Sequence, residues 1–437
     1  MMLTSIKTVN YKYLIVLIYI LCNLENAFIN FTFSPIVKSL KFAYNVSDFD
    51  IYYLSICYSI FYLFMNFPAN YIIEHRGIKS SLLIFAIGQV ICCIFRLFIN
   101  ESISYVYIGQ TISALSCPFC NNVVSKISLN WFESKQRIIS TSFMTSSYML
   151  GSGFTFILST FFVEDPVINP DISLQKNQIL AYMASGFFLS IGILIMVFFF
   201  FIEKPENPCC LVADYPRESY FESLKLIIRN KNFVYLCSGF ALQTSNFCLF
   251  VVYTHFILTP FGFSETQIAY IGSLVNFWCF FGKLVIGYLV YRVFSFKKSL
   301  FYICLSLLVS ILGFLLSLIS GSSALIFIFS CFFGFFLQMY WSPSYEFACE
   351  LIFPVGEANA NGGLILCGCL INIVFGFIFS IIFSLNERIW VPFTFSYFLI
   401  STAISLVLFR NTKEDLNREK KEFELNAKTN SFPLLEY

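Results

Sequence analysis

Charged side chains are scarce in this sequence. Asp, Glu, Lys and Arg make up 12% of the 437 residues, and 58% are hydrophobic, whereas a soluble globular chain carries about 25% charged residues. The low charge therefore predicts an integral membrane protein. The long apolar runs lack the strict alternation of barrel strands, so we expect all-α structure with transmembrane helices, which need about 20 mainly apolar residues each.

Histidine is scarcer still, since His75 and His255 are the only two. Neither shares an expected helix with a candidate acid, so no pair of nucleophile and base can be named. The sixteen cysteines lie mostly inside apolar runs, where Cys acts as a small hydrophobic residue. A net charge of +2 gives no reason for a nucleic-acid partner. The sequence predicts no metal site, no cofactor and no enzymatic activity.

A polar segment at 203–231 divides the apolar sequence into two parts of nearly equal length. Each charge at the centre of a bilayer costs about 2.5–3.5 kcal/mol on the mildest scale, so this segment must lie in water. The first part predicts six helices, at about 11–33, 51–73, 80–99, 103–126, 138–163 and 179–202. The second predicts helices at about 233–257, 266–290, two within 299–345, 359–384 and 389–410.

The uncharged run at 299–345 would form about 70 Å of helix at about 1.5 Å per residue, too long for one crossing. Gly321 lies where a return turn is needed. We therefore expect a twelve-helix protein. Its expected parts are a cytosolic N-terminus at 1–10, a bundle at 11–202, a cytosolic linker at 203–231, a bundle at 232–410 and a solvated, partly disordered cytosolic tail at 411–437.

Lysine and arginine set the expected orientation. Most of the 27 lie on the side of the N-terminus, the linker and the tail, so the positive-inside rule places both termini in the cytosol. The N-x-S sequons of Asn45 and Asn100 then lie outside, where they could be glycosylated. We expect a monomer in the plasma membrane, with an internal membrane as the alternative. No small-residue cleavage site follows the first apolar run, which disfavours a signal peptide.

Two loops share a pattern. Residues 70–79 read NYIIEHRGIK, and residues 287–292 read GYLVYR with two lysines shortly after. Both resemble the G-x-x-x-D-R-x-G-R-K loop of the major facilitator superfamily. The first has Asn70 for Gly and Glu74 for Asp, and the second has Tyr291 for Asp. The resemblance implies two parallel six-helix bundles that alternate access to a central site.

Further stretches narrow the match. They are TFSPI at 32–36, GQ at 109–110, PF at 118–119, WFESKQR at 131–137, LG at 150–151, YEFACE at 345–350 and FPVGE at 353–357. They are similar to the feline leukaemia virus subgroup C receptor-related family. That resemblance implies a facilitative carrier with a choline- or ethanolamine-like, haem-related or vitamin-like substrate.

The same resemblance bears on the site. Choline carriers of that family are thought to hold the ammonium group against a Trp and a Tyr, with two Gln nearby. The matching positions here read Asn30, Cys248, Met149 and Cys369. Each desolvated cation–π contact supplies up to about 2 kcal/mol, so the loss of both rings implies weak choline binding unless Phe28, Phe31 or Phe247 substitutes.

Polar residues inside the expected helices are candidates for the substrate pathway. Glu25 stands out, since an intramembrane acid usually faces a cavity or a partner. It could hold a cationic substrate or take up a proton, pair with Arg96, or face another helix in protonated form. The remaining candidates, by position or by the family correspondence, are Asn26, Asn30, Tyr148, Met149, Gln243, Asn246, Cys248 and Asn372. Each could instead form an interhelical hydrogen bond worth about 0.6 kcal/mol.

Charges near the inner helix ends are candidates for gating. Lys283 could pair with Glu350 or Glu357, and Glu74 could pair with Arg137 in the first half. Such pairs bias a two-state equilibrium only if they differ between the states. The candidates are Glu74, Lys79, Arg137, Lys283, Arg292, Glu350 and Glu357. The alternative is that these side chains merely extend into the lipid headgroups.

Together these features predict a membrane transporter for a small polar or charged metabolite, working by alternating access. Its partners would be that small molecule and the lipid bilayer. The alternative is a receptor or sensor that keeps the fold without transporting.

Overall fold

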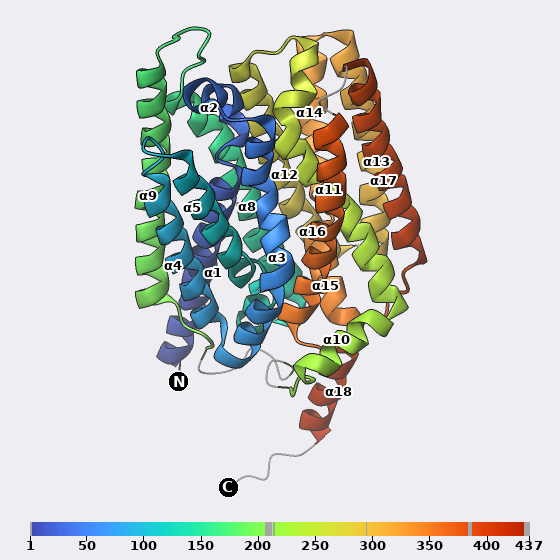
Figure 1. Cartoon of the computed structure of the whole chain (residues 1–437). Coiled ribbons are helices and arrows are strands. Elements are labelled where there is room, and N and C mark those ends of the chain that lie inside the picture. Colours follow the sequence, from blue (N-terminus) through green and yellow to red (C-terminus); the bar gives the residue numbers. More distant parts are fainter. Residues whose placement is uncertain (1, 206–211, 213–214, 294, 383–386, 432–437) are drawn as a thin grey trace.

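The computed structural model describes residues 2–205, 212, 215–293, 295–382 and 387–431. Long helices stand side by side in two groups, coloured blue to green and yellow to red in Figure 1. The first group contains α1 (Met2–Phe31), η1 (Ser34–Ile36), α2 (Val37–Tyr44), α3 (Asp48–Arg76), α4 (Ile78–Arg96), α5 (Ile103–Ser116), α6 (Pro118–Asn121), α7 (Val124–Trp131), α8 (Ser134–Phe162) and α9 (Ile172–Phe200). The second contains α11 (Lys231–Leu258), η3 (Thr259–Phe261), α12 (Glu265–Arg292), α13 (Phe296–Ser320), α14 (Ser323–Leu337), α15 (Trp341–Leu351), α16 (Glu357–Ile382) and α17 (Glu387–Asn411).

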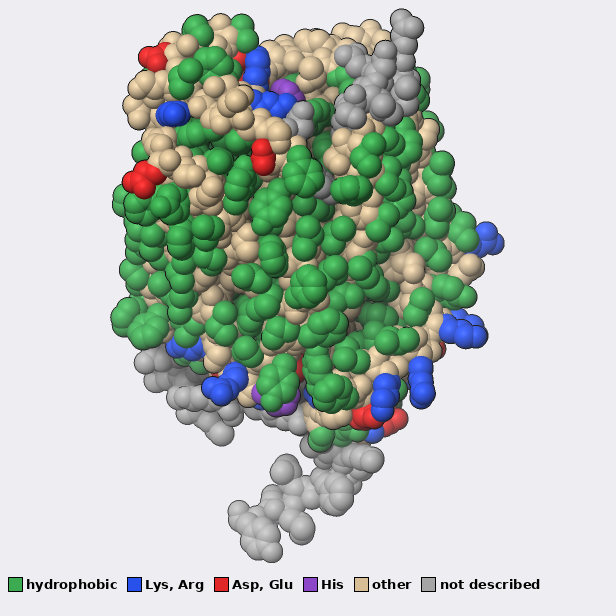
Figure 2. Space-filling model, in the orientation of Figure 1, with side chains coloured by type: hydrophobic (Ala, Val, Ile, Leu, Met, Phe, Trp, Pro, Cys, Tyr) green, Lys and Arg blue, Asp and Glu red, His purple; other side chains and the backbone are tan. Residues whose placement is uncertain are grey.

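The expected all-helical fold of twelve crossings is confirmed. Among the described residues, ten of these crossings are long and apolar enough to span a membrane by length and composition alone. The other two are the broken α5–α7 segment and α8, which is rich in Ser and Thr. Figure 2 shows hydrophobic side chains across the middle of the molecule and most charged side chains at its two ends. This distribution is what a bilayer requires, because charges are stable only in the flanking water.

Three crossings are interrupted. Pro35 lies in the first turn of η1 after α1, and Pro118 begins α6 after α5. A proline fits the first turn of a helix, where its missing N–H would have no partner. Residues 338–340 separate α14 from α15. The first and fourth crossings are therefore longer than the ranges expected from the apolar runs, ending at Tyr44 and Trp131.

Local sequence determines several helix ends. Ser47 and Asp50 form a capping box that begins α3, and Ser264 and Gln267 do the same for α12. Gly321 adopts a positive φ of 65° at the end of α13, at the expected return turn. The expected polar loop at 131–137 is mostly helix, since α7 ends at Trp131 and α8 begins at Ser134.

The charged tail, expected to be solvated and partly disordered, is helical over most of the residues that the structure describes. It forms α18 (Asn417–Ser431), which lies with the linker helix α10 (Tyr220–Arg229) at one end of the bundle (Figure 1). Arg418 is 2% exposed and lies 2.8 Å from both Glu346 and Glu350 of α15. Burial alone would lower the pKa of Arg418, but the Glu350 and Glu346 carboxylates raise it well above its ordinary value. The tail is therefore anchored by ion pairs that a count of charges cannot show.

The two halves pack most closely along α8 with α12 and along α3 with α16. Glycines make this possible. A Cβ atom on Gly287 of α12 would collide with Ser142 of α8, and one on Gly362 of α16 would collide with Asn66 of α3. The space left between these two seams contains the candidate site.

Candidate functional site

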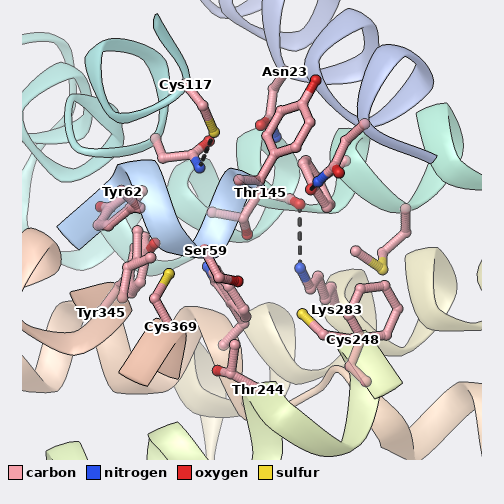
Figure 3. A pocket seen from close by; sticks show the side chains of 18 of the residues that line it. Asn23, Ser59, Tyr62, Cys117, Thr145, Thr244, Cys248, Lys283, Tyr345 and Cys369 are labelled. Carbon is pink, nitrogen blue, oxygen red and sulfur yellow. Dashed lines mark hydrogen bonds between the residues drawn. The ribbon is translucent and has the colours of Figure 1, made fainter. Parts of the chain in front are cut away.

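A cavity lies between the two halves. Side chains of both halves form its wall, so a molecule inside it would contact both. The wall is rich in aromatic rings, hydroxyl groups and amides (Figure 3). The lining residues are Tyr19, Asn23, Asn30, Tyr58, Ser59, Tyr62, Cys117, Asn121, Thr145, Tyr148, Met149, Thr244, Phe247, Cys248, Lys283, Trp341, Tyr345, Ile365 and Cys369.

Several residues expected in the substrate pathway lie on this wall. They are Asn30, Tyr148, Met149 and Cys248, and Cys369 joins them. All four positions that correspond to the choline site of the similar family therefore face one cavity. Of the three phenylalanines that could replace the missing rings, Phe247 lines the cavity. Phe31 packs edge-on against Phe247, with ring centroids 6.2 Å apart, and Phe28 packs against Tyr182 instead.

Hydrogen bonds fix the amides of α1. Asn30 Nδ2 donates to the Tyr148 hydroxyl at 2.9 Å, which links α1 to α8 on the cavity wall. Asn26 Nδ2 donates to Asn121 Oδ1 at 2.9 Å, which links α1 to α6. Asn26 itself does not line the cavity, but its partner Asn121 does.

Glu25 does not face the cavity, which corrects its expected place in the substrate pathway. It is fully buried beside Ser190 of α9 and Cys93 of α4. Asn23 faces the cavity, and two residues further along a helix is a rotation of about 200°, which points Glu25 to the opposite side. The expected pair with Arg96 is not formed either, since the Arg96 guanidinium lies 4.9 Å from the centre of the Phe33 ring. Glu25 faces neighbouring helices, as the third alternative requires.

Two more pathway candidates, Asn246 and Asn372, form interhelical hydrogen bonds, and a third, Gln243, bonds within its own helix. Asn246 donates to Thr402 at 3.2 Å and accepts from Ser401 at 2.8 Å, which joins α11 to α17. Gln243, one turn earlier, is also buried and lies 3.5 Å from the Asn246 amide. Asn372 donates to Ser59 of α3 at 2.8 Å, and Ser59 lines the cavity. These contacts match the structural alternative, and Asn372 supports the wall from behind.

Lys283 lies on the cavity wall, whereas we expected it to belong to a gate near the inner helix ends. Its Nζ donates to the Thr145 carbonyl at 3.2 Å (Figure 3) and lies 4.9 Å from the centre of the Trp341 ring. It is nine residues, about 13 Å of helix, from Arg292 at the end of α12. The expected partners are engaged elsewhere, because Glu350 pairs with Arg418 and Glu357 pairs with Arg217 at 2.8 Å.

The first-half gating pair is also replaced. Glu74 pairs with Lys126 at 2.9 Å, and Arg137 pairs with Glu422 of α18 at 3.2 Å. Glu74 nevertheless lies against Gly356 of the second half, where a Cβ atom would crowd its carboxylate. Glu74 therefore pairs with Lys126, and Arg137 pairs with Glu422 of the tail, whereas we had expected Glu74 and Arg137 to pair with each other.

The remaining expected residues lie at the two ends of the molecule. The backbone N–H of Lys79 donates to Glu203 of the linker at 2.8 Å. Arg292 lies 5.0 Å from the centre of the Tyr291 ring. Asn45 and Asn100 are both exposed. Among the residues that the structure describes, no three His, Cys, Asp or Glu side chains gather in a way that could hold a metal ion.

Comparison with known families agrees with this architecture. A model of the Major Facilitator Superfamily matches residues 19–376. The chain belongs to the major facilitator superfamily. It is therefore a multi-pass membrane transporter rather than an enzyme, with a small molecule as its partner. The structure of a proton:xylose symporter of the superfamily aligns with a TM-score of 0.78 and 12% identity, over 95% of this chain and 99% of that one.

This major facilitator also has curated relatives of the expected kind. The human choline/ethanolamine transporter FLVCR2 is 26% identical over 399 residues, covering 87% of this chain and 72% of that protein. The cat choline/ethanolamine transporter FLVCR1 is 24% identical over 378 residues, covering 83% and 66%. An uncharacterized MFS-type transporter of Caenorhabditis elegans is 22% identical over 427 residues, covering 95% and 71%. These relatives confirm the resemblance to the feline leukaemia virus subgroup C receptor-related family that the sequence motifs indicate.

Nearly two thirds of the lining residues were not named from the sequence. Thr145 could have been found, because it lies one turn before Tyr148 and Met149 on the same helix face. Asn23 and Tyr19 likewise lie seven and eleven residues before Asn30, which is two and three turns. Lys283 was noticed but assigned to a gate. The aromatic residues Tyr58, Tyr62 and Tyr345 had no such signal, because tyrosine is frequent throughout this chain.

Proposed function

We propose that this transporter moves a small polar or charged metabolite by alternating access, with its two halves rocking about the central cavity. The observation that carries the proposal is the wall itself, to which both halves contribute. A ligand held by both halves can favour one arrangement of them over another, which is what couples binding to movement.

Contacts between the halves at two levels support this mechanism. Toward the end that holds α18, Thr141 donates to Glu346 at 2.6 Å and Asn361 donates to Ser125 at 2.8 Å. Toward the opposite end, the backbone N–H of Lys38 donates to Glu265 at 3.1 Å. A molecule could leave on either side only after one of these sets has broken. Small numbers of hydrogen bonds, worth about 0.5–1.5 kcal/mol each, suit a reversible closure.

Family resemblance supports a choline- or ethanolamine-like, haem-related or vitamin-like substrate. Among these, choline should be transported weakly unless Phe247, which lines the wall, replaces one of the aromatic rings that are missing at Asn30 and Cys248. The positive-inside pattern supports cytosolic termini, and we propose a monomer in the plasma membrane without a nucleic-acid partner.

Uptake into proteoliposomes tests the transport proposal. Purified protein should accumulate its substrate saturably when a panel of labelled metabolites is offered. Cys369→Trp should abolish this uptake, because the indole would fill the cavity. Cys331→Trp is the matched control, since Cys331 lies on α14 away from the cavity lining, and it should transport normally. Ligand binding without flux in the wild-type protein would instead favour a receptor or sensor.

A further inference from the structure

The charge on the cavity wall is unbalanced. Among the lining residues that the structure describes, Lys283 is the one charged side chain, and none is Asp or Glu. Lys283 projects from α12 and is 1% exposed. A buried cation loses its hydration and needs compensation from an opposite charge or from several hydrogen bonds. The wall supplies only part of that compensation.

The contacts of Lys283 leave donors for a ligand. Its ammonium group carries three N–H donors, and the Thr145 carbonyl accepts from one of them at 3.2 Å. The Trp341 ring, with its centre 4.9 Å away, adds a favourable cation–π contact. A carbonyl dipole and a ring face reduce the unfavourable energy of a full charge without neutralising it. Because Lys283 lines the cavity, its further donors can reach a molecule bound there.

The buried carboxylates on α15 and α16 are bound to other groups. Glu346 accepts from Thr141 and pairs with Arg418, and Glu350 also pairs with Arg418. Glu357 pairs with Arg217, and Glu25 lies on the far side of α1. In the described part of the chain, no carboxylate pairs with Lys283, so an anion from outside the protein fits best.

Tyr148 adds a second donor on the same wall. Its hydroxyl oxygen accepts from Asn30 Nδ2 at 2.9 Å, so its own O–H remains available to donate. Tyr148 lies one turn after Thr145 on α8, and Thr145 is the residue that binds Lys283. Lys283 of α12, which donates to Thr145, and Tyr148 of α8 thus supply two donors on the same wall, one for each oxygen of a carboxylate. The rings of Phe247 and Trp341 offer apolar contact to the rest of such a molecule.

We propose that the cavity recognises a small organic acid or zwitterion, whose carboxylate pairs with Lys283 and accepts a hydrogen bond from Tyr148. This inference rests on the proposed transport function in one respect, namely that the bound acid is the transported substrate. The same positive charge disfavours a ligand whose only charge is a quaternary ammonium. The substrate class would therefore differ from choline, which gives the similar transporters their names.

Matched pairs of probes test the inference on the full-length purified protein. Lactate and propane-1,2-diol, benzoate and benzyl alcohol, and glycine betaine and choline each differ by exchange of a carboxylate for a hydroxymethyl group. Thermal shift titrations give the apparent affinity of each probe, and proteoliposome uptake gives its flux. We expect at least one acid to bind about tenfold or more tightly than its alcohol, because hydrogen bonds to charged groups are strong.

Variants assign the preference to Lys283. Lys283→Met should lower the affinity for the acid by about 10- to 100-fold and leave the alcohol unchanged. Lys283→Arg should retain part of the preference, because it keeps the charge. Tyr148→Phe should lower acid affinity by a smaller factor of about 2 to 10. Lys225→Met is the matched control, since Lys225 is exposed on the linker helix, and it should leave both affinities unchanged.

The possible outcomes separate the two proposals. If no acid binds more tightly than its alcohol, or if the preference survives in Lys283→Met, the carboxylate inference is wrong. Uptake of choline without any preference for acids would leave transport standing and reject the inference alone. Acids that bind through Lys283 without being taken up would support carboxylate recognition and reject transport.

Discussion

The orientation of Glu25 on its helix decides whether its carboxylate can contact a molecule in the cavity. An acid in a membrane helix is often functional, yet Glu25 lies beside Ser190 and Cys93 and away from the cavity. The cavity side of α1 carries Tyr19, Asn23 and Asn30 instead. Because these residues alternate with other polar ones along the helix, the sequence could identify the set but could not tell which members face inward.

Replacement of Glu25 tests this orientation. We expect Glu25→Gln to change the apparent affinity of a bound ligand by less than about twofold, because the carboxylate does not touch the cavity. Asn23→Leu is the comparison on the cavity face, where loss of a hydrogen-bonding amide should lower affinity by about 2- to 10-fold. Thermal shift titration measures both. A loss of affinity in Glu25→Gln as large as that in Asn23→Leu would contradict the orientation.

At the scale of helices, the apolar runs predicted the number and order of the membrane crossings well, because each crossing must exclude charge from the bilayer. Breaks within crossings were harder to place. Pro118 leaves a helix possible on both of its sides, so only packing shows that α5 ends and α6 begins there. The extension of the first crossing to Tyr44 was missed because Lys38 and Lys41 looked like the residues of a loop. Lys38 pairs with Asp165 at 3.0 Å, which offsets its charge at the membrane edge.

Glycines in the helix interfaces give a prediction at this scale. A Cβ atom on Gly151 of α8 would collide with the backbone of Leu24 in α1, whereas one on Gly192 of α9 would meet nothing within 4 Å. We expect Gly151→Ala to destabilise the protein by about 1–3 kcal/mol through overpacking. Gly192→Ala should instead stabilise it by about 0.5–1 kcal/mol, because Ala favours the helix. Unfolding midpoints in detergent measure both, and equal shifts would contradict this account of the α1–α8 contact.

For the whole molecule, the fold could be predicted from two hydrophobic halves and a polar linker, whereas the tail could not. Residues 411–437 are strongly charged, and such sequences are usually solvated. The structure shows why residues 417–431 form a helix. Glu346 and Glu350 at the end of α15 form a buried acidic pair that Arg418 neutralises. The buried partners lie more than sixty residues away in sequence, so local composition carries no sign of them.

Helix α18 also contacts both halves, which gives a prediction about the transport cycle. Arg418 binds α15 of the second half, and Glu422 binds Arg137 of the first half at 3.2 Å. Deleting the chain from Asn417 onward would remove both contacts and leave Glu346 and Glu350 to repel each other. Removing one partner of a buried ion pair typically destabilises a protein by about 3–5 kcal/mol. We therefore expect the halves to separate more often at the end that holds α18.

Alkylation of Cys349, quantified by mass spectrometry, measures this opening. Cys349 lies between the two acids on α15 and is 2% exposed, so it should react about tenfold or more faster after the deletion, since a tenfold change corresponds to about 1.4 kcal/mol. Cys304 in α13, also buried, serves as the internal control and should keep its rate. Glu422→Gln breaks only the contact between the halves and should give an intermediate rate. If Cys349 reacts at the same rate in all three proteins, α18 does not hold the halves together.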